Sequence, residues 1–233
     1  MNKHIKLLSF LLLFSLSSFA QVYKNPIASK KSHPELEITQ IAITDTNTII
    51  SLKVTNKRNE GGWFCADDNI YIKNTKGTEI YKLINAENIP ICPDQFKFSY
   101  SGQTLEFSLY FPPISDQIKF IDLIEDCSNA CFSFYGIILD NEHNEKIRAF
   151  ERGFELYQNQ QKTEAITFFE KVISGKMSID SHIYGLSYYY LIVIYHELGN
   201  TEKVTFWYQK LLNSNLEEKD TFIKELERLG IKN

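Results

Sequence analysis

The spacing of apolar residues changes its period near Asn141, and this change divides the chain into two parts. Before Asn141, apolar and polar residues alternate over short stretches, which is typical of strands with one buried face. Leu105, Phe107, Leu109 and Phe111 show the clearest alternation. After Asn141, the apolar residues recur at helical spacing. The pattern therefore predicts a two-domain α+β protein with the strands first and the helices second.

About eight short strands are expected in the first part, over residues 34–140. Many short strands joined by turns favour an antiparallel β-sandwich of the immunoglobulin-like kind. Residues 74–77 supply a hairpin turn, and Pro112-Pro113 ends the strand with the clearest alternation. The expected strands lie near residues 36–43, 50–54, 70–72, 79–84, 96–98, 105–111, 118–124 and 132–139.

Two helix pairs and a last helix are expected in the second part, over residues 141–233. Helical spacing from His143 to Val172 predicts the first pair, with a connector at residues 174–181. Residues 182–198 and 201–212 predict the second pair, and residues 216–229 a terminal capping helix. The turn after the third helix falls at Gly199-Asn200, because both residue types favour helix ends.

The first twenty residues have the three parts of a cleavable export signal. Lys3 and Lys6 give a basic start, residues 7–14 are almost wholly apolar, and Ala20 ends a small-residue cleavage site. The apolar run is far shorter than the ~20 residues of a membrane-spanning helix. We expect cleavage after Ala20, export to the periplasm or the medium, and a flexible leader at residues 21–33. No cysteine follows the cleavage site, so neither a lipid anchor nor a membrane-bound mature form is expected.

The charge of the chain argues against a nucleic-acid partner. The full chain has a formal net charge of −4, and loss of residues 1–20 removes Lys3 and Lys6 but no acid. The remaining residues have 23 basic and 29 acidic side chains, a net charge of −6. A nucleic-acid-binding protein needs a basic face.

All four cysteines lie in the β part, and an even count in an exported chain predicts two disulfides. Three pairings are possible. We favour Cys65 with Cys92 and Cys127 with Cys131, because each pair closes a local loop between expected strands. The antibody order of cysteine, tryptophan, cysteine is absent, because Trp63 precedes both members of the first pair.

Residues 149–173 resemble a tetratricopeptide repeat, and residues 188–212 repeat part of the pattern. In the first unit Gly153 and Ala165 take the positions of the small residues at which two helices cross closely. Phe169 and Val172 then take packing positions. The matching residues of the second unit are Tyr195, Gly199, Tyr208 and Leu211, whereas Ile192 and Val204 replace its small residues.

The resemblance implies a binding surface on the concave face, which the first helix of each repeat lines. By position, the residues that would contact a protein partner are Phe150, Phe154, Tyr157, Tyr189, Val193 and His196. The alternative is that these side chains pack inside the protein, because aromatic residues at helical spacing are more often core than binding surface.

The β part is similar to an uncharacterised sandwich domain of exported proteins from Bacteroidetes-type bacteria. The similarity covers residues 34–140 and implies a fold and an envelope location, not an activity. It lies in Ser101-Gly102, in the segment from Phe107 to Pro113, in residues 120–125 and in residues 134–137.

The sequence offers no catalytic or metal-binding motif that would favour an enzyme. Three residues separate Cys127 from Cys131 and acids precede them, whereas a redox pair needs two and a depressed thiol pKa. His196-Glu197 lacks the second histidine of a zinc protease. The acids Glu60, Asp67, Asp68 and Asp94 lack the spacing of a calcium loop, so we interpret them as a solvated acidic region.

The sequence therefore favours two kinds of binding function over an enzyme. The first is a non-enzymatic interaction or scaffold protein, without cofactor or metal, that uses the helices to hold a protein partner. The alternative is a module that binds a glycan or a cell-wall fragment through the β-sandwich, with Trp63 and Tyr100 as the stacking residues. An enzyme comes third, because two acids brought together by the fold would suffice for glycoside chemistry.

Overall fold

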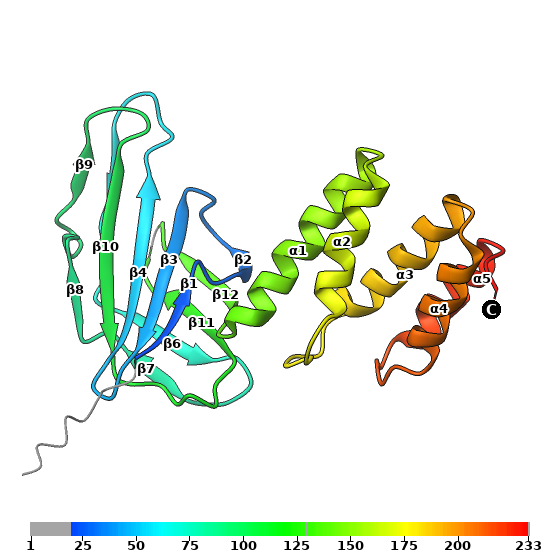
Figure 1. Cartoon of the computed structure of the whole chain (residues 1–233). Coiled ribbons are helices and arrows are strands. Elements are labelled where there is room, and N and C mark those ends of the chain that lie inside the picture. Colours follow the sequence, from blue (N-terminus) through cyan, green and yellow to red (C-terminus); the bar gives the residue numbers. More distant parts are fainter. Residues whose placement is uncertain (1–19, 129, 233) are drawn as a thin grey trace, which may run out of the picture.

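The computed structural model describes residues 20–128 and 130–232, which form twelve strands followed by five helices (Figure 1). The two-domain α+β organisation is confirmed, and the first helix begins at Asn141 as the change of period predicts. Residues 1–19 of the expected export signal lie outside the described residues.

The strands form two five-stranded antiparallel sheets and a short two-stranded one. The first sheet has the order β1 (Gln21–Lys24), β3 (Leu36–Ile43), β4 (Thr48–Thr55), β10 (Thr104–Phe111) and β8 (Asn85–Glu87). The second has the order β2 (Ala28–Lys31), β12 (Ser133–Ile138), β11 (Phe120–Glu125), β6 (Ile70–Asn74) and β7 (Ile80–Lys82). Strands β5 (Gly62–Phe64) and β9 (Phe96–Phe98) form the third.

Alternation along the strands builds the core between the two large sheets. Leu109 of β10 lies opposite Ile50 of β4, and both side chains are fully buried. Ile121 and Leu123 of β11 supply buried residues of the same core from the second sheet. A sheet with one buried face needs this period of two, which explains why these strands are visible in the sequence.

The expected flexible leader at residues 21–33 is wrong, because this segment forms strands β1 and β2. Strand β1 pairs with β3 in the first sheet, and β2 pairs with β12 in the second. Asn25, with φ of 45°, lies between them where the chain passes from one sheet to the other. Only Tyr23 and Pro26 of residues 21–33 are buried. Backbone hydrogen bonds at the sheet edges hold the segment, so its apolar pattern is too weak to reveal the strands.

Five helices follow the sandwich and pack in chain order. They are α1 (Asn141–Gln158), α2 (Lys162–Ile173), α3 (His182–Glu197), α4 (Thr201–Leu212) and α5 (Lys219–Arg228). The main contacts join α1 to α2, α2 to α3, and α3 to both α4 and α5. Within the described part of the chain, none of these helices has the length and apolar character that crossing a membrane requires.

Small residues permit the close helix crossings. Gly153 is buried in α1, and a Cβ atom there would meet the Cβ atom of Phe168 at 3.1 Å. Ala165 of α2 is fully buried. These are two of the positions on which the tetratricopeptide resemblance depends, and the structure gives both a packing role.

Helix α1 is attached to the sandwich by polar side chains of its first two turns. Asp140 caps the helix by accepting a hydrogen bond from the backbone N–H of His143 at 2.8 Å. Asn141 donates to the carbonyl of Val22 at 2.7 Å, and Arg148 donates to the carbonyl of Asn25. The segment that contains β1 and β2 is therefore also the surface on which the helical part docks.

Candidate functional site

A cavity of about 470 Å³ opens at one end of the sandwich. Its volume falls within the range of small-molecule binding sites. The walls come from the β2–β3 loop, the end of β4 and its following loop, β5 and the β5–β6 loop, β9 and the segment before it, and the β11–β12 loop. The lining residues are His33, Glu35, Val54, Thr55, Asn56, Lys57, Arg58, Gly62, Trp63, Phe64, Cys65, Asp67, Cys92, Pro93, Gln95, Phe98, Glu125, Cys127, Ser128 and Ala130.

Both disulfides lie at this cavity. Cys65 pairs with Cys92, with Cα atoms 5.4 Å apart, and Cys127 pairs with Cys131, with Cα atoms 5.6 Å apart. The favoured pairing is confirmed. Three of the four cysteines line the cavity, and each disulfide contributes at least one of them. Covalent links that fix loops in one conformation lower the entropy lost when a ligand binds.

Glu125, at the end of β11, is buried and organises the wall on the side of the second sheet. One carboxylate oxygen accepts the backbone N–H of Asp67 at 2.8 Å, and the other accepts that of Phe132 at 2.9 Å. Burial raises the pKa of Glu125, while these two N–H donors and nearby His33 oppose the rise. The carboxylate thus joins the β5–β6 loop to the start of β12.

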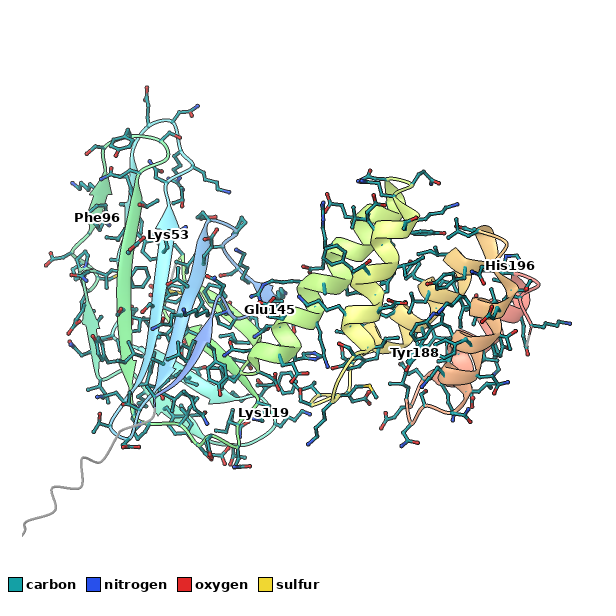
Figure 2. All side chains as sticks on the ribbon, viewed as in Figure 1. Lys53, Phe96, Lys119, Glu145, Tyr188 and His196 are labelled. Carbon is teal, nitrogen blue, oxygen red and sulfur yellow. A yellow bond between two sulfur atoms is a disulfide. The ribbon has the colours of Figure 1, made fainter. Side chains whose placement is uncertain are left out.

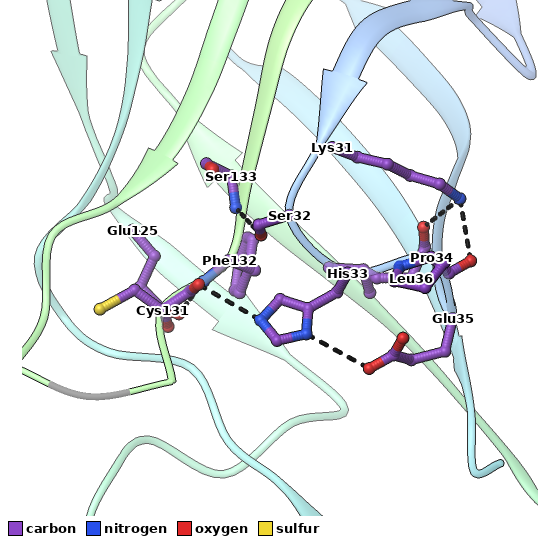
Figure 3. Close-up of polar contacts among 10 residues, drawn as sticks. All are labelled: Lys31, Ser32, His33, Pro34, Glu35, Leu36, Glu125, Cys131, Phe132 and Ser133. Carbon is purple, nitrogen blue, oxygen red and sulfur yellow. Dashed lines mark hydrogen bonds and ion pairs between the residues drawn. The ribbon is translucent and has the colours of Figure 1, made fainter.

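His33 links the β2–β3 loop to the same wall (Figure 3). Its Nδ1 lies 3.2 Å from a carboxylate oxygen of Glu35, and its Nε2 lies 3.3 Å from the carbonyl oxygen of Cys131. Protonated His33 would donate to both oxygens. Both ring nitrogens therefore have a structural partner.

Asn56 shapes the loop that follows β4. Its side chain donates to the carbonyl of Tyr100 at 2.8 Å and accepts from the backbone N–H of Arg58 at 3.1 Å. A Cβ atom at Gly62 would lie 2.5 Å from the Asn56 Oδ1, so only glycine fits this close approach. The loop carries the exposed side chains of Lys57 and Arg58 into the cavity lining.

Trp63 is 46% exposed, although tryptophan is usually well buried. Its neighbour Phe64 packs against the rings of Phe107 and Phe132, at centroid distances of 5.8 and 6.1 Å. Side chains alternate along a strand, so Trp63 lies on the opposite, exposed face of β5. Tyr100 is 63% exposed but is not among the lining residues.

The aromatic residues that the tetratricopeptide resemblance places on a binding surface are half-buried and pack around one tyrosine of α3. Phe150, Phe154 and Tyr157 of α1 surround Tyr190 of α3, at centroid distances of 6.3, 5.5 and 5.3 Å. Tyr190 also stacks on Phe169 of α2. Tyr190 lies at the centre of this cluster but was not among the expected residues. The run Tyr188-Tyr189-Tyr190 is the feature of the sequence that could have indicated it.

The remaining helical residues differ in accessibility. Val193 is 7% exposed and Tyr189 is half-buried, whereas His196 is exposed near the C-terminal end of α3 (Figure 2). The Tyr157 hydroxyl donates to Glu197 at 2.9 Å, and Glu197 also contacts Lys162 at 3.1 Å. Burial raises the pKa of Tyr157 to about 12, and the Glu197 carboxylate adds to the rise.

No group of three or more histidine, cysteine or acidic side chains in the described ranges 20–128 and 130–232 is arranged to hold a metal ion. No protein-family model, curated protein or solved structure matches the chain.

Proposed function

We propose that the protein is an exported, non-enzymatic binding protein whose β-sandwich takes a glycan or a cell-wall fragment in the cavity. The convergence of both disulfides on this one cavity is the observation that carries the proposal. Disulfides spread over the fold would serve stability alone, whereas here they fix the walls that a ligand would contact.

The lining suits a sugar. The half-exposed indole of Trp63 offers a flat apolar face to a sugar ring. Thr55, Gln95 and Ser128 add hydroxyl and amide groups, which both donate to and accept from sugar hydroxyls. Glu125 and His33 have structural partners at both of their polar atoms, so a binding role suits this site better than acid–base catalysis.

Fluorescence of Trp63 tests the proposal. Trp63 and Trp207 are the two tryptophans of the chain, so the Trp207→Phe variant makes Trp63 the single reporter. Titration of this variant with oligosaccharides and soluble peptidoglycan fragments should change the emission of Trp63 at saturable concentrations. Trp63→Ala should abolish retention on the immobilised ligand, while Trp63→Phe should keep part of it. If no glycan in the set changes the emission of Trp63, and the protein is not retained on any immobilised glycan, the proposal is refuted.

A second candidate function is a helical platform for a protein partner. The observation in its favour is Phe206 of α4, which is 45% exposed. The amino groups of Lys203 and Lys210 lie 5.4 and 5.7 Å from the centre of its ring. An exposed aromatic side chain between two cations suits a partner segment with apolar and acidic residues.

Crosslinking pull-down from the native envelope tests this second function. His196→Ala/Phe206→Ser removes exposed side chains and should release the partner while the fold is kept. Tyr157→Ala/Tyr189→Ala also disturbs the aromatic cluster, so its fold must be verified by circular dichroism before a loss of partner is interpreted. Equal recovery of the partner by wild type and by His196→Ala/Phe206→Ser would exclude this surface.

A further inference from the structure

We infer that the ligand of the cavity is an anionic glycan, one whose sugar rings carry carboxylate or sulfate groups. The inference rests on the proposed glycan-binding function and adds the charge of the ligand to it. The charged side chains at the cavity are of two kinds. The acidic ones have hydrogen-bond partners within the protein, whereas the cationic ones form no ion pair among the described residues.

Each acidic residue of the cavity lining has a hydrogen-bond partner within the protein. Glu35 contacts His33, and Glu125 accepts two backbone N–H groups. Asp67 accepts the backbone N–H of Asn69 at 2.9 Å. These acids hold the loops in place, and a bound cation would have to compete with those contacts.

The two cationic residues of the lining differ from the acids. Lys57 and Arg58 are exposed, and within residues 20–128 and 130–232 neither forms an ion pair. The backbone N–H of Arg58 donates to the Asn56 side chain, so the Arg58 side chain starts from a fixed position beside the cavity. An arginine that is free of internal contacts is suited to bidentate recognition of a carboxylate or a sulfate.

A third cation lies beside the proposed stacking residue. Lys97 of β9 is directly opposite Trp63 of β5 in the short antiparallel sheet, and both residues are exposed. Side chains opposite one another in such a pair lie on the same face, with Cβ atoms ~5 Å apart. A sugar ring on the indole would therefore have positive charge at its edge. This local charge contrasts with the net charge of −4 of the chain.

The helical part leaves the cavity open to a chain-like ligand. Strand β12 starts next to the β11–β12 loop that lines the cavity, and it ends where α1 begins. Its six residues span about 20 Å. The cavity and the junction with the helices thus lie at opposite ends of the strand.

Calorimetric titration of the full mature chain with three probes tests the inference. The probes are an oligogalacturonate, the same oligomer as its methyl ester, and a chondroitin sulfate oligosaccharide. We expect at least one anionic probe to bind about tenfold more tightly than the neutral ester, an advantage that rising salt removes. Preference for the oligogalacturonate identifies carboxylate as the recognised group. Preference for the chondroitin sulfate, which carries carboxylates as well, shows that sulfate adds to recognition.

Matched variants separate this inference from the proposed function. Lys57→Gln/Arg58→Gln should lose the preference for the anionic probes. Lys73→Gln/Lys119→Gln, which removes the same charge from exposed sites outside the cavity lining, should keep it. If neither anionic probe binds more tightly than the ester, the inference is overturned and glycan binding is left intact. No binding of any probe, with Trp63 emission unchanged, would overturn both.

Discussion

The side chain of Asn144 in α1 accepts a hydrogen bond from the backbone N–H of Ile27 at 3.1 Å, across 117 positions of sequence. Its amide nitrogen donates to the carbonyl of Ile138 at 3.0 Å. Asn144 is 1% exposed, so both bonds are shielded from water. This residue joins the first helix to the segment between β1 and β2 and to the last strand of the sandwich.

Asn144→Ala should lower the free energy of unfolding by about 1–3 kcal/mol, because it leaves a buried N–H and a carbonyl without partners. Urea denaturation followed by circular dichroism measures the change. Asn141→Ala is the matched control, since exposed Asn141 loses a single bond to Val22 and should cost less than about 1 kcal/mol. Equal losses for the two variants would contradict the role assigned to Asn144.

Glu125 should make the stability of the protein depend on pH in mildly acidic solution. Its pKa in the folded protein lies above the ordinary value of 4.5, so the folded state binds the proton first. The stabilisation from this proton is complete below pH 4.5 and is lost as the pH rises through the folded-state pKa. Glu125→Gln should remove this dependence, as denaturation at a series of pH values would show.

The same variant should be less stable than wild type at neutral pH. An amide accepts through one oxygen only, so the N–H of Asp67 or of Phe132 would lose its acceptor, at a cost of about 1–3 kcal/mol. Ser128→Ala, on the same loop but exposed, is the control and should change stability by less than about 0.5 kcal/mol. A fully stable Glu125→Gln protein would show that the carboxylate does not hold these two segments.

Tyr157 should ionise only near pH 12, because burial and the bond to Glu197 favour the neutral phenol. The difference between wild type and Tyr157→Phe in ultraviolet absorbance, measured against pH, isolates this group. Its contribution to stability is complete below the ordinary pKa of 10 and is lost as the pH rises toward 12. Glu197→Gln should lower the pKa of Tyr157 but leave it above 10, because burial is the larger cause. Ionisation at pH 10 would show that Tyr157 is open to solvent.

Gly185→Ala should destabilise the contact between α3 and α5. A Cβ atom at this position would lie 2.0 Å from the ring of Phe222, which is buried and cannot move freely. We expect a net loss of about 1–3 kcal/mol, although alanine favours the helix more than glycine does. Gly185→Ala/Phe222→Leu should recover part of the loss in thermal unfolding. An unchanged thermal unfolding midpoint in Gly185→Ala would show that α3 and α5 can move apart without loss of stability.

Local signals explain which parts of the fold the sequence predicted. Strands such as β4 and β10 alternate because one face is buried, and helices α1, α2, α4 and α5 repeat their apolar residues because one side packs. Helix α3 is apolar over most of its surface, with Leu191 to Ile194 all buried, because it packs against helices on several sides. The pairing in which each cysteine pair closes a local loop was favoured over the two alternatives, and both favoured disulfides form. The sequence identified part of the candidate site, namely Trp63 and the cysteines. No local pattern marked His33, Lys57, Arg58 or Glu125 as cavity residues.

The sequence by itself thus determined the longer strands and helices and the boundary at Asn141, and it favoured the two disulfides that form, because each depends on residues near one another in the chain. Only the tertiary structure decided that residues 21–33 are strands, that Tyr190 lies among the aromatic residues of α1, and that five loops enclose one cavity. These features depend on contacts between distant segments: the backbone of β1 and β2 satisfies its hydrogen bonds with strands and side chains up to more than a hundred positions away. No pattern within residues 21–33 records those partners, because these short strands bury few apolar side chains and are held mainly by backbone pairing with distant strands.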